Sequence, residues 1–203
     1  MLAVDECGEV VDGDQLMSIC GNYMKQKGTL KKNTIVATVM SNLGMFLMGE
    51  REGIHIEKTK VGDRYVLENM LENGYNIGGE QSGHIIFLDE NTTGDGLLSA
   101  LHLLQVMTET KKKLSELASI MEVLPQALVN AKVPNHKKEH FEEYAEIAEA
   151  IAEVEAKFAG EGRVLIRPSG TEPLVRVMIE GKDQQLIESE AQKLAELISS
   201  IML

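Results

Sequence analysis

Two short segments of the sequence concentrate side chains that could bind a phosphorylated ligand. The first reads RVLIRPSGTEPLVR, in which Arg167 ends one expected strand and Arg176 lies within the next, with Ser169, Gly170 and Thr171 in the turn between them. Guanidinium groups form charge-assisted hydrogen bonds with phosphate oxygens. A glycine at positive φ lets successive backbone N–H groups converge on one anion. The pattern predicts an anion site; the alternative is a plain hairpin turn whose arginines pair with glutamates.

The second segment reads GGEQSGH and lies between two expected strands. Glu80, Ser82 and His84 alternate, so all three would point the same way if the loop is extended. A carboxylate and a hydroxyl suit the adjacent hydroxyls of a sugar, and His84 could hydrogen-bond, bind an anion or move a proton. The alternative is a glycine-rich turn with exposed polar groups.

Three other polar groupings are explained by local structure. In the segment VGDR, Asp63 is expected to cap a helix, whereas Arg64 could reach a ligand at the sheet edge. His136 and His140 have the i, i+4 spacing of metal ligands, but the sequence offers no third ligand, so a solvated helix start is favoured. Asp12, Gly13 and Asp14 form a turn followed by a helix cap. We therefore expect no metal site in this chain.

The composition excludes several classes of function. The 203 residues include 20 Lys and Arg against 32 Asp and Glu, a formal net charge of −12. This charge disfavours both nucleic acids and anionic membranes as partners. No apolar run approaches the ~18 residues of a membrane span, and no signal-peptide pattern opens the sequence. Two isolated cysteines, Cys7 and Cys20, give no disulfide framework, so a reducing, cytoplasmic location is expected.

The elements that must position the GGEQSGH loop alternate between strands and helices. The β-branched run Thr34–Met40 is almost continuously apolar, which is typical of a strand covered on both faces of a parallel sheet. The pattern predicts further strands at 55–60, 75–78 and 85–88. It also predicts helices at 15–27, 64–72 and 114–121, and two more that end at about 52 and about 110. Asp14, Ser41 or Asn42, and Thr93 or Asp95 are the expected helix caps. This alternation predicts an α/β domain with a mixed, mostly parallel sheet and crossover helices.

A change of pattern follows Pro125. The sequence predicts strands at 127–133, 163–167 and 174–180, and helices at 138–158 and 183–201. The first of these helices has an apolar stripe from Phe141 to Phe158, and its glutamates are expected to face solvent. A hairpin between two helices predicts a small α+β domain, with helices on one face of an antiparallel sheet.

The motifs in their order resemble those of the α-D-phosphohexomutases. The resemblance rests on GGEQSGH followed by a strand and TTGDG, on RPSGTEPLVRVM, and on TVMSNLG and VGDRY, and it covers essentially the whole chain. The wording GEQSGH is similar to the amino-sugar branch of the family. The phosphomannomutase/phosphoglucomutase branch, whose middle residue usually differs, is the alternative.

The resemblance implies a four-domain enzyme around a central cleft. Such enzymes of the amino-sugar branch interconvert glucosamine 6-phosphate and glucosamine 1-phosphate through a phosphoserine and a bisphosphorylated sugar, with Mg²⁺ at the serine. Glu80 and Ser82 match the residues that contact sugar hydroxyls, and His84 belongs to the same loop. The residues that match the loop binding the phosphate that is not transferred are Arg167, Ser169, Gly170 and Thr171, supported by Arg176.

Two family motifs are absent from this sequence, namely the serine loop and the Asp-rich metal loop. The resemblance therefore implies that residues 1–12 end the second domain, 13–124 form the third and 125–203 form the fourth. The nucleophile and the Mg²⁺ ligands are expected upstream, in N-terminal domains that would be partners of this chain. Alone, it is expected to bind a small phosphosugar without turnover. A non-catalytic phosphosugar-binding module is a further alternative, and the oligomeric state is left open.

Overall fold

The computed structural model describes residues 1–158, 160 and 162–203. The chain divides into two compact units, Met1–Val123 and Leu124–Leu203, and each is described by itself. Within the described residues, no helix is both long enough and apolar enough to cross a membrane.

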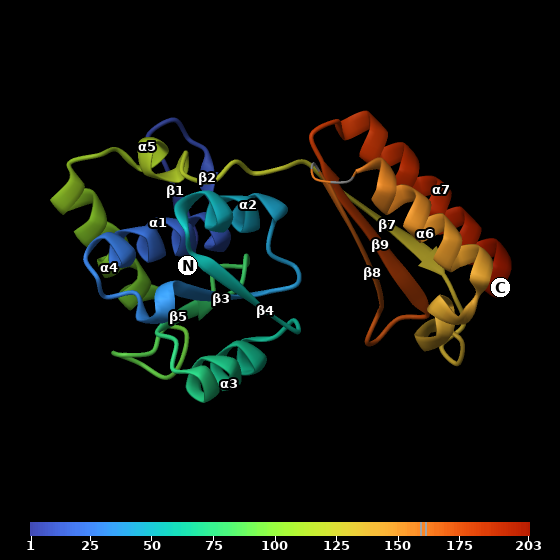
Figure 1. The fold of residues 1–203 in the computed structure, drawn as a ribbon, viewed down its shortest axis with the longest axis horizontal. Coiled ribbons are helices and arrows are strands. Elements are labelled where there is room, and N and C mark those ends of the chain that lie inside the picture. The colour runs from blue at the N-terminus through green and yellow to red at the C-terminus, as the bar shows by residue number, and fades with distance from the viewer. Residues whose placement is uncertain (159, 161) are drawn as a thin grey trace. The chain divides into compact units, whose positions relative to one another are not determined.

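The first unit is an α/β domain built on a mixed sheet (Figure 1). Its strand order is β4-β3-β5-β6, with β3 parallel to β4 and β5 and with β6 antiparallel to β5. The expected mixed, mostly parallel sheet is thus confirmed. The elements in chain order are β1 (Ala3–Val4), β2 (Val10–Val11), α1 (Gly13–Gln26), η1 (Lys31–Asn33), β3 (Thr34–Thr38), α2 (Leu43–Glu52), β4 (His55–Thr59), α3 (Asp63–Asn73), β5 (Ile77–Gly79), β6 (Ile85–Phe87), α4 (Gly96–Thr110) and α5 (Leu114–Ala118).

Strand β3 is buried on both faces, as its continuous apolar run predicts. Ile35 and Ala37 belong to the larger core, which they share with α1, α2 and α4. Val36 points to the opposite face and packs with Val66 and Met70 of α3. Successive side chains of a strand alternate between faces, so the sheet is covered by α3 on one side and by the other helices on the other (Figure 1).

Helix α1 begins two residues earlier than the sequence indicates, at Gly13 instead of Gln15. Asp12, and not Asp14, is the N-cap: its carboxylate accepts from the Gln15 amide at 3.0 Å, and the Gln15 side chain accepts from the Asp12 amide at 3.3 Å. This reciprocal capping box satisfies two helix-end donors at once. Asp14 is buried instead, and its Oδ2 accepts from the Asn42 amide at 2.7 Å. The expectation that Asp14 caps this helix was therefore wrong.

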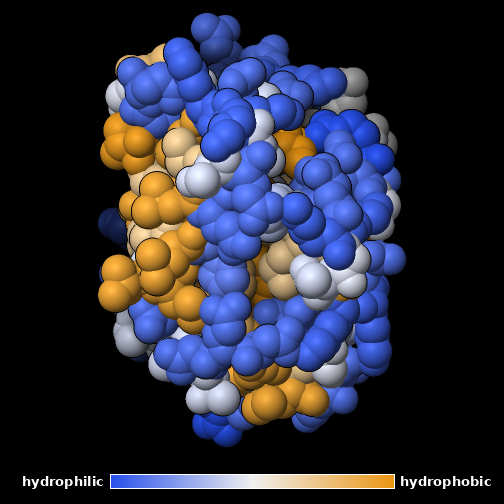
Figure 2. All heavy atoms as spheres, turned by 90° about the vertical axis from the view of Figure 1, so that its left-hand side faces the viewer, coloured by the Kyte–Doolittle hydropathy of each residue, from blue (hydrophilic) through white to orange (hydrophobic). Residues whose placement is uncertain are grey.

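Helix α4 carries an exposed apolar stripe. The helix is capped by Asp95, one of the two expected caps, and it buries Leu103 and Val106 in the core. Leu97, Leu101 and Leu104 lie more than half exposed on another side of the helix. Figure 2 views the molecule from the side on which α4 lies in Figure 1, and hydrophobic side chains gather in a band on that face.

The second unit is an antiparallel sheet with its helices on one face (Figure 1). Its elements are β7 (Gln126–Lys132), η2 (Lys138–Glu143), α6 (Ala145–Lys157), β8 (Gly162–Pro168), β9 (Leu174–Gly181) and α7 (Gln184–Met202). The strand order is β7-β9-β8, and both pairings are antiparallel. Val175, Val177 and Ile179 alternate along β9 into a core shared with α6 and α7. The predicted α+β fold is confirmed.

The long helix expected at 138–158 is interrupted. Residues Lys138–Glu143 form a 3-10 helix, and α6 begins only after Tyr144, whose backbone is extended at φ −86° and ψ 112°. The break lets both Lys138 and Phe141 turn inward, and both are buried. It also changes the phase of the apolar stripe, so that Ile147 is buried and Ala148, which the pattern placed on the stripe, is exposed. The glutamates of this region are exposed, as predicted.

Candidate functional site

Two arginines face one another across the β8–β9 hairpin. The register pairs Arg167 with Arg176 directly, whereas Arg163, on the same face of β8, pairs with Glu180 and donates from Nε to its carboxylate at 2.8 Å. Burial in the first place, and the charge of Arg176 in the second, hold the pKa of Arg167 below its ordinary value. Nη2 of Arg176 reaches Glu172 Oε2 at 3.2 Å. Within the described part of the chain, no carboxylate is paired with Arg167, so the hairpin presents an uncompensated positive charge.

The turn that joins the two strands is held by its own hydrogen bonds. Ser169 is buried, its amide donates to the Leu174 carbonyl at 2.9 Å, and its hydroxyl accepts from the Glu172 amide at 3.2 Å. Gly170 and Thr171 are exposed at the tip. Gly170 does not have positive φ, so the expected left-handed glycine is not found here. A Cβ at this position would have no neighbour within 4 Å, which indicates open space in front of the backbone.

A buried lysine beneath this turn was missed by the sequence analysis. Nζ of Lys138 donates to the carbonyls of Ser169 and of Glu172, the latter at 3.2 Å. The residue is only 8% exposed. A buried ammonium needs such acceptors, and in return it fixes the two carbonyls and places a positive charge under the loop. The only signal in the sequence is that Lys138 precedes the buried Phe141 by three residues, which places both on one side of a helical turn.

The GGEQSGH loop is a tight hairpin between β5 and β6 and not the extended segment that the sequence suggested. The Glu80 amide donates to the His84 carbonyl at 3.0 Å, and the Gly83 amide donates to the Glu80 carbonyl at 2.9 Å. Glu80 and His84 therefore face each other across the hairpin, and both are half-buried. Ser82 lies at the exposed tip. The three side chains come from one small loop, and the strand alternation expected from the sequence does not align them.

The start of α3 lies beside this loop. Oε1 of Glu80 accepts from the Gly62 amide at 3.1 Å, and Nε2 of His84 lies 3.4 Å from Asp63 Oδ2. Arg64 is differently placed, because its Nε donates to Glu68 on the same helix at 2.7 Å and its side chain is 81% exposed. The bond to Glu68 raises the pKa of Arg64.

Two glycines allow the loop to seat closely against its neighbours. A Cβ on Gly94 would lie 2.4 Å from His84 Nε2, so the imidazole packs directly on the backbone of the TTGDG segment. A Cβ on Gly13 would lie 2.1 Å from the Glu80 carbonyl oxygen. The Gly13 amide donates to the Gln81 carbonyl at 2.9 Å, and Gln81 Nε2 donates to Asp12 Oδ2 at 3.3 Å. The loop is thus anchored by the first turn of α1 as well as by α3.

The described residues do not form a metal site. Among them, no three His, Cys, Asp or Glu side chains are grouped closely enough to hold an ion. His140, one of the pair noted in the sequence, has its Nδ1 2.6 Å from Glu143 Oε1.

Comparison with known families defines the class of this protein. Residues 12–124 match the family model described as phosphoglucomutase/phosphomannomutase, alpha/beta/alpha domain III. Residues 128–197 match the model for the C-terminal domain of the same family. The chain belongs to the phosphoglucomutase/phosphomannomutase family, as the resemblance of its motifs indicated.

Individual relatives refine this assignment. The chain is 63% identical over 198 residues to a phosphoglucosamine mutase of Ruminiclostridium cellulolyticum and 64% identical to that of Acetivibrio thermocellus. These matches cover 98% of this chain but 44% of each relative, so the chain spans less than half of their length. The fold is similar to that of N-acetylphosphoglucosamine mutase of Aspergillus fumigatus, solved with GlcNAc-6P and magnesium, with a TM-score of 0.77, 18% identity, and coverage of 100% of this chain and 46% of that one.

Proposed function

We propose that this chain forms the sugar- and phosphate-binding part of a phosphoglucosamine mutase, an isomerase that interconverts glucosamine 6-phosphate and glucosamine 1-phosphate. The observation that carries the proposal is the 63–64% identity, over nearly the whole chain, to bacterial proteins of that name. We assign residues 1–12 to the end of a second domain, 13–124 to a third and 125–203 to a fourth. The cytoplasmic location expected from the cysteines stays a prediction.

The phosphate role is assigned to the β8–β9 hairpin. Arg167 and Arg176 repel one another in the free protein, and a phosphate dianion between them would replace that repulsion by charge-assisted hydrogen bonds. The backbone at Gly170 and Thr171 is open to an approaching anion. Because its hydroxyl accepts from Glu172, Ser169 shapes the turn. This loop would hold the phosphate that stays on the sugar, so that remote binding energy positions the reacting hydroxyl.

The sugar role is assigned to the Glu80–His84 hairpin. The second oxygen of the Glu80 carboxylate and the exposed Ser82 hydroxyl are suited to neighbouring sugar hydroxyls. His84, whose Nε2 lies 3.4 Å from Asp63 Oδ2, would hold this loop against the start of α3 beside the bound sugar. Arg64 contributes to this site only if its bond to Glu68 is exchanged for one to the ligand.

The phosphoserine and Mg²⁺ of the proposed reaction are assigned to parts of the protein other than the residues described here. The described residues offer no cluster of three or more metal-ligating side chains. A fungal neighbour in fold was solved with magnesium, which supports Mg²⁺ as the cofactor of the intact enzyme. On this proposal the missing N-terminal domains are the macromolecular partner and a phosphosugar is the small-molecule partner.

Isothermal titration of the chain with glucosamine 6-phosphate and with unphosphorylated glucosamine tests the proposal. We expect saturable binding of the phosphorylated sugar alone, and no turnover. Turnover by the 203-residue chain would refute the assignment of the nucleophile elsewhere. A glucosamine titration equal to that of the phosphosugar would refute the phosphate loop.

The family description also includes phosphoglucomutase and phosphomannomutase, so the sugar needs a separate test. The rates of the intact enzyme on glucosamine, glucose and mannose 6-phosphates decide it. A preference for the amino sugar is expected, and a preference for glucose or mannose would overturn the glucosamine assignment.

A further inference from the structure

One cavity of the first unit lies away from the Glu80–His84 hairpin. It has a volume of about 460 Å³ and opens between α1, α4 and the end of β6. None of the residues of the GGEQSGH loop lines it, and a volume of this size is typical of a small-molecule site. The side chains that line the cavity determine which ligand it could bind.

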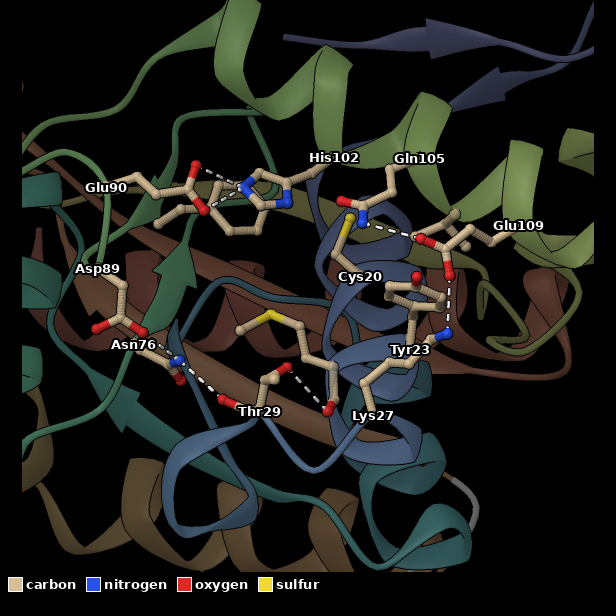
Figure 3. Close-up of a pocket in the computed structure, with 13 residues that line it drawn as sticks. Cys20, Tyr23, Lys27, Thr29, Asn76, Asp89, Glu90, His102, Gln105 and Glu109 are labelled. Atoms are coloured by element: carbon tan, nitrogen blue, oxygen red, sulfur yellow. Dashed lines mark hydrogen bonds and ion pairs between the residues drawn. The ribbon is translucent and has the colours of Figure 1, made fainter.

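The floor and one wall of this cavity are apolar and aromatic. Met24, Val106 and the buried Cys20 line its inner surface. The His102 ring stacks on Phe87, with centroids 3.8 Å apart and planes inclined by 17°. Figure 3 shows Tyr23 on the α1 side of the cavity and His102 on the far side. These surfaces suit a compact apolar or aromatic body.

The rim of the cavity is acidic. Glu109 pairs with Lys27 at 2.7 Å and accepts from Gln105 at 3.0 Å, which leaves its pKa at about 2. Asp89 pairs with Lys31 and with the buried amide of Asn76, which donates at 2.8 Å. Glu90 differs from both: its contact in the described residues is the imidazole of His102, at 3.1 Å, and no lysine or arginine there pairs with it. Glu90 therefore holds a negative charge without a permanent cation.

We propose that this cavity binds a small organic cation, an ammonium group on a compact aromatic or aliphatic body. The ammonium would pair with Glu90 at the rim, and the body would pack on His102, Tyr23 and Met24. Cations are attracted both to the Glu90 carboxylate and to the aromatic faces, whereas that carboxylate repels phosphate and carboxylate ligands. The proposal does not depend on the reaction that the intact protein catalyses.

Nuclear magnetic resonance titration with phenethylamine tests this site, with 3-phenylpropionate as a ligand of similar body and opposite charge. We expect shifts at the lining residues with phenethylamine alone. Glu90→Gln should weaken phenethylamine binding by about threefold to tenfold, the scale of one charged hydrogen bond at a half-exposed site. Glu72→Gln removes an exposed carboxylate from α3, on the other face of the sheet, and should change nothing.

A second variant and a chemical probe test whether the ligand occupies this cavity, without changing the charge of its rim. Gln105→Trp fills the mouth of the cavity from an exposed position, and it should abolish binding without affecting the fold. In a Cys7→Ser background, phenethylamine should slow the alkylation of Cys20 on the cavity floor. Equal shifts with 3-phenylpropionate, equal losses in Glu72→Gln and Glu90→Gln, or unchanged alkylation of Cys20 would each overturn the proposal.

Discussion

Arg167 and Arg176 are direct cross-strand partners, and they lie on the face of the hairpin where Arg163 has a glutamate opposite it. Like charges at directly opposed positions destabilise a sheet. The repulsion between these two arginines lowers the stability of the free protein. An anion bound between them would replace that repulsion by attraction. On the proposed function, the hairpin therefore carries one arginine, Arg163, that stabilises the fold and another, Arg167, that would bind the ligand.

Arg167→Gln tests this separation. We expect the affinity for glucosamine 6-phosphate to fall by about tenfold or more, because a charged hydrogen bond contributes about 1.5–3 kcal/mol. The free energy of unfolding should stay unchanged or rise by up to about 1 kcal/mol as the repulsion is removed. Arg163→Gln is the matched control: it should lower stability, since it deprives Glu180 of a partner at 2.8 Å, and leave affinity unchanged. Calorimetric titration and urea unfolding of both variants measure the two quantities, and the reverse pattern would contradict this assignment.

Lys138→Met should damage the phosphate loop from below. The change leaves the carbonyls of Ser169 and Glu172 without their buried donor, at a cost of about 1–3 kcal/mol in stability. Phosphosugar affinity should fall as well, because the loop is no longer held and a nearby positive charge is lost. Lys132→Met, at an exposed position of β7, removes the same charge as a control. If both variants bind equally well, Lys138 has no role in the site.

Gly170→Ala isolates the space in front of the phosphate loop. The backbone there is not left-handed and an added Cβ meets no atom within 4 Å, so stability should be preserved. Reduced freedom of the unfolded chain should even add about 0.4–1 kcal/mol. Affinity for the phosphosugar should nevertheless drop, because the methyl group occupies the path of the anion. Unchanged affinity by calorimetry would show that the phosphate approaches elsewhere.

Gly94→Ala should disturb His84 without changing any titrating group. The new Cβ would lie 2.4 Å from Nε2, so the imidazole must move away from Asp63. We expect weaker phosphosugar binding and altered chemical shifts of the His84 ring protons by NMR, because the ring is displaced from its contacts with Gly94 and Asp63. Gly28→Ala provides a glycine control with no steric neighbour, although its φ of +72° makes it the less stable variant. Ring-proton chemical shifts equal to those of the unsubstituted chain would contradict the proposed contact.

The two cysteines should differ sharply in reactivity. Burial raises the pKa of Cys20 to about 12, whereas Cys7 is exposed, so alkylation near neutral pH should modify Cys7 first. The same shift makes stability depend on pH. The folded chain holds the Cys20 proton more tightly than the unfolded chain, so this contribution is complete below pH 9 and is lost as pH rises from 9 toward 12. In this range, the contribution of Cys20 to the free energy of unfolding should change by up to about 1.4 kcal/mol per pH unit. If the unsubstituted chain and Cys20→Ala show the same dependence of unfolding on pH, the shift is refuted.

Local signals predicted most elements of the fold. Asn42, Asp95 and Asp183 cap the helices that follow them, and Gly53 and Gly74 end helices in the left-handed conformation. Each of these features depends on a few neighbouring residues, and such dependence can be read from a sequence. Both candidate loops were likewise found from residue types within a short segment.

The structural features that the sequence did not predict depend on contacts between residues far apart in the chain. Helical periodicity continues through Tyr144, but the structure has a break there, between the 3-10 helix and α6. Lys138, before the break, bonds to a loop 31 residues further along the chain. Asp14 and Asp12 are equally good caps by composition, and the bond from Asn42 to Asp14 decides between them. The pairing of Arg167 with Arg176 depends on the register of β8 against β9, which the sequence does not state. A one-residue slip would have moved the side chains of one strand to the other face of the sheet.

The anchoring of the Glu80–His84 hairpin also has a consequence for the order of folding. Gln81 bonds to Asp12, 69 residues away in sequence, and Glu80 bonds to Gly62 at the start of another helix. Contacts between such distant segments form only after the intervening chain has been brought together. The Glu80–His84 hairpin therefore acquires its shape among the last parts of its unit. If it binds the sugar as proposed, a nascent or partly unfolded chain would not bind the ligand before its core is complete.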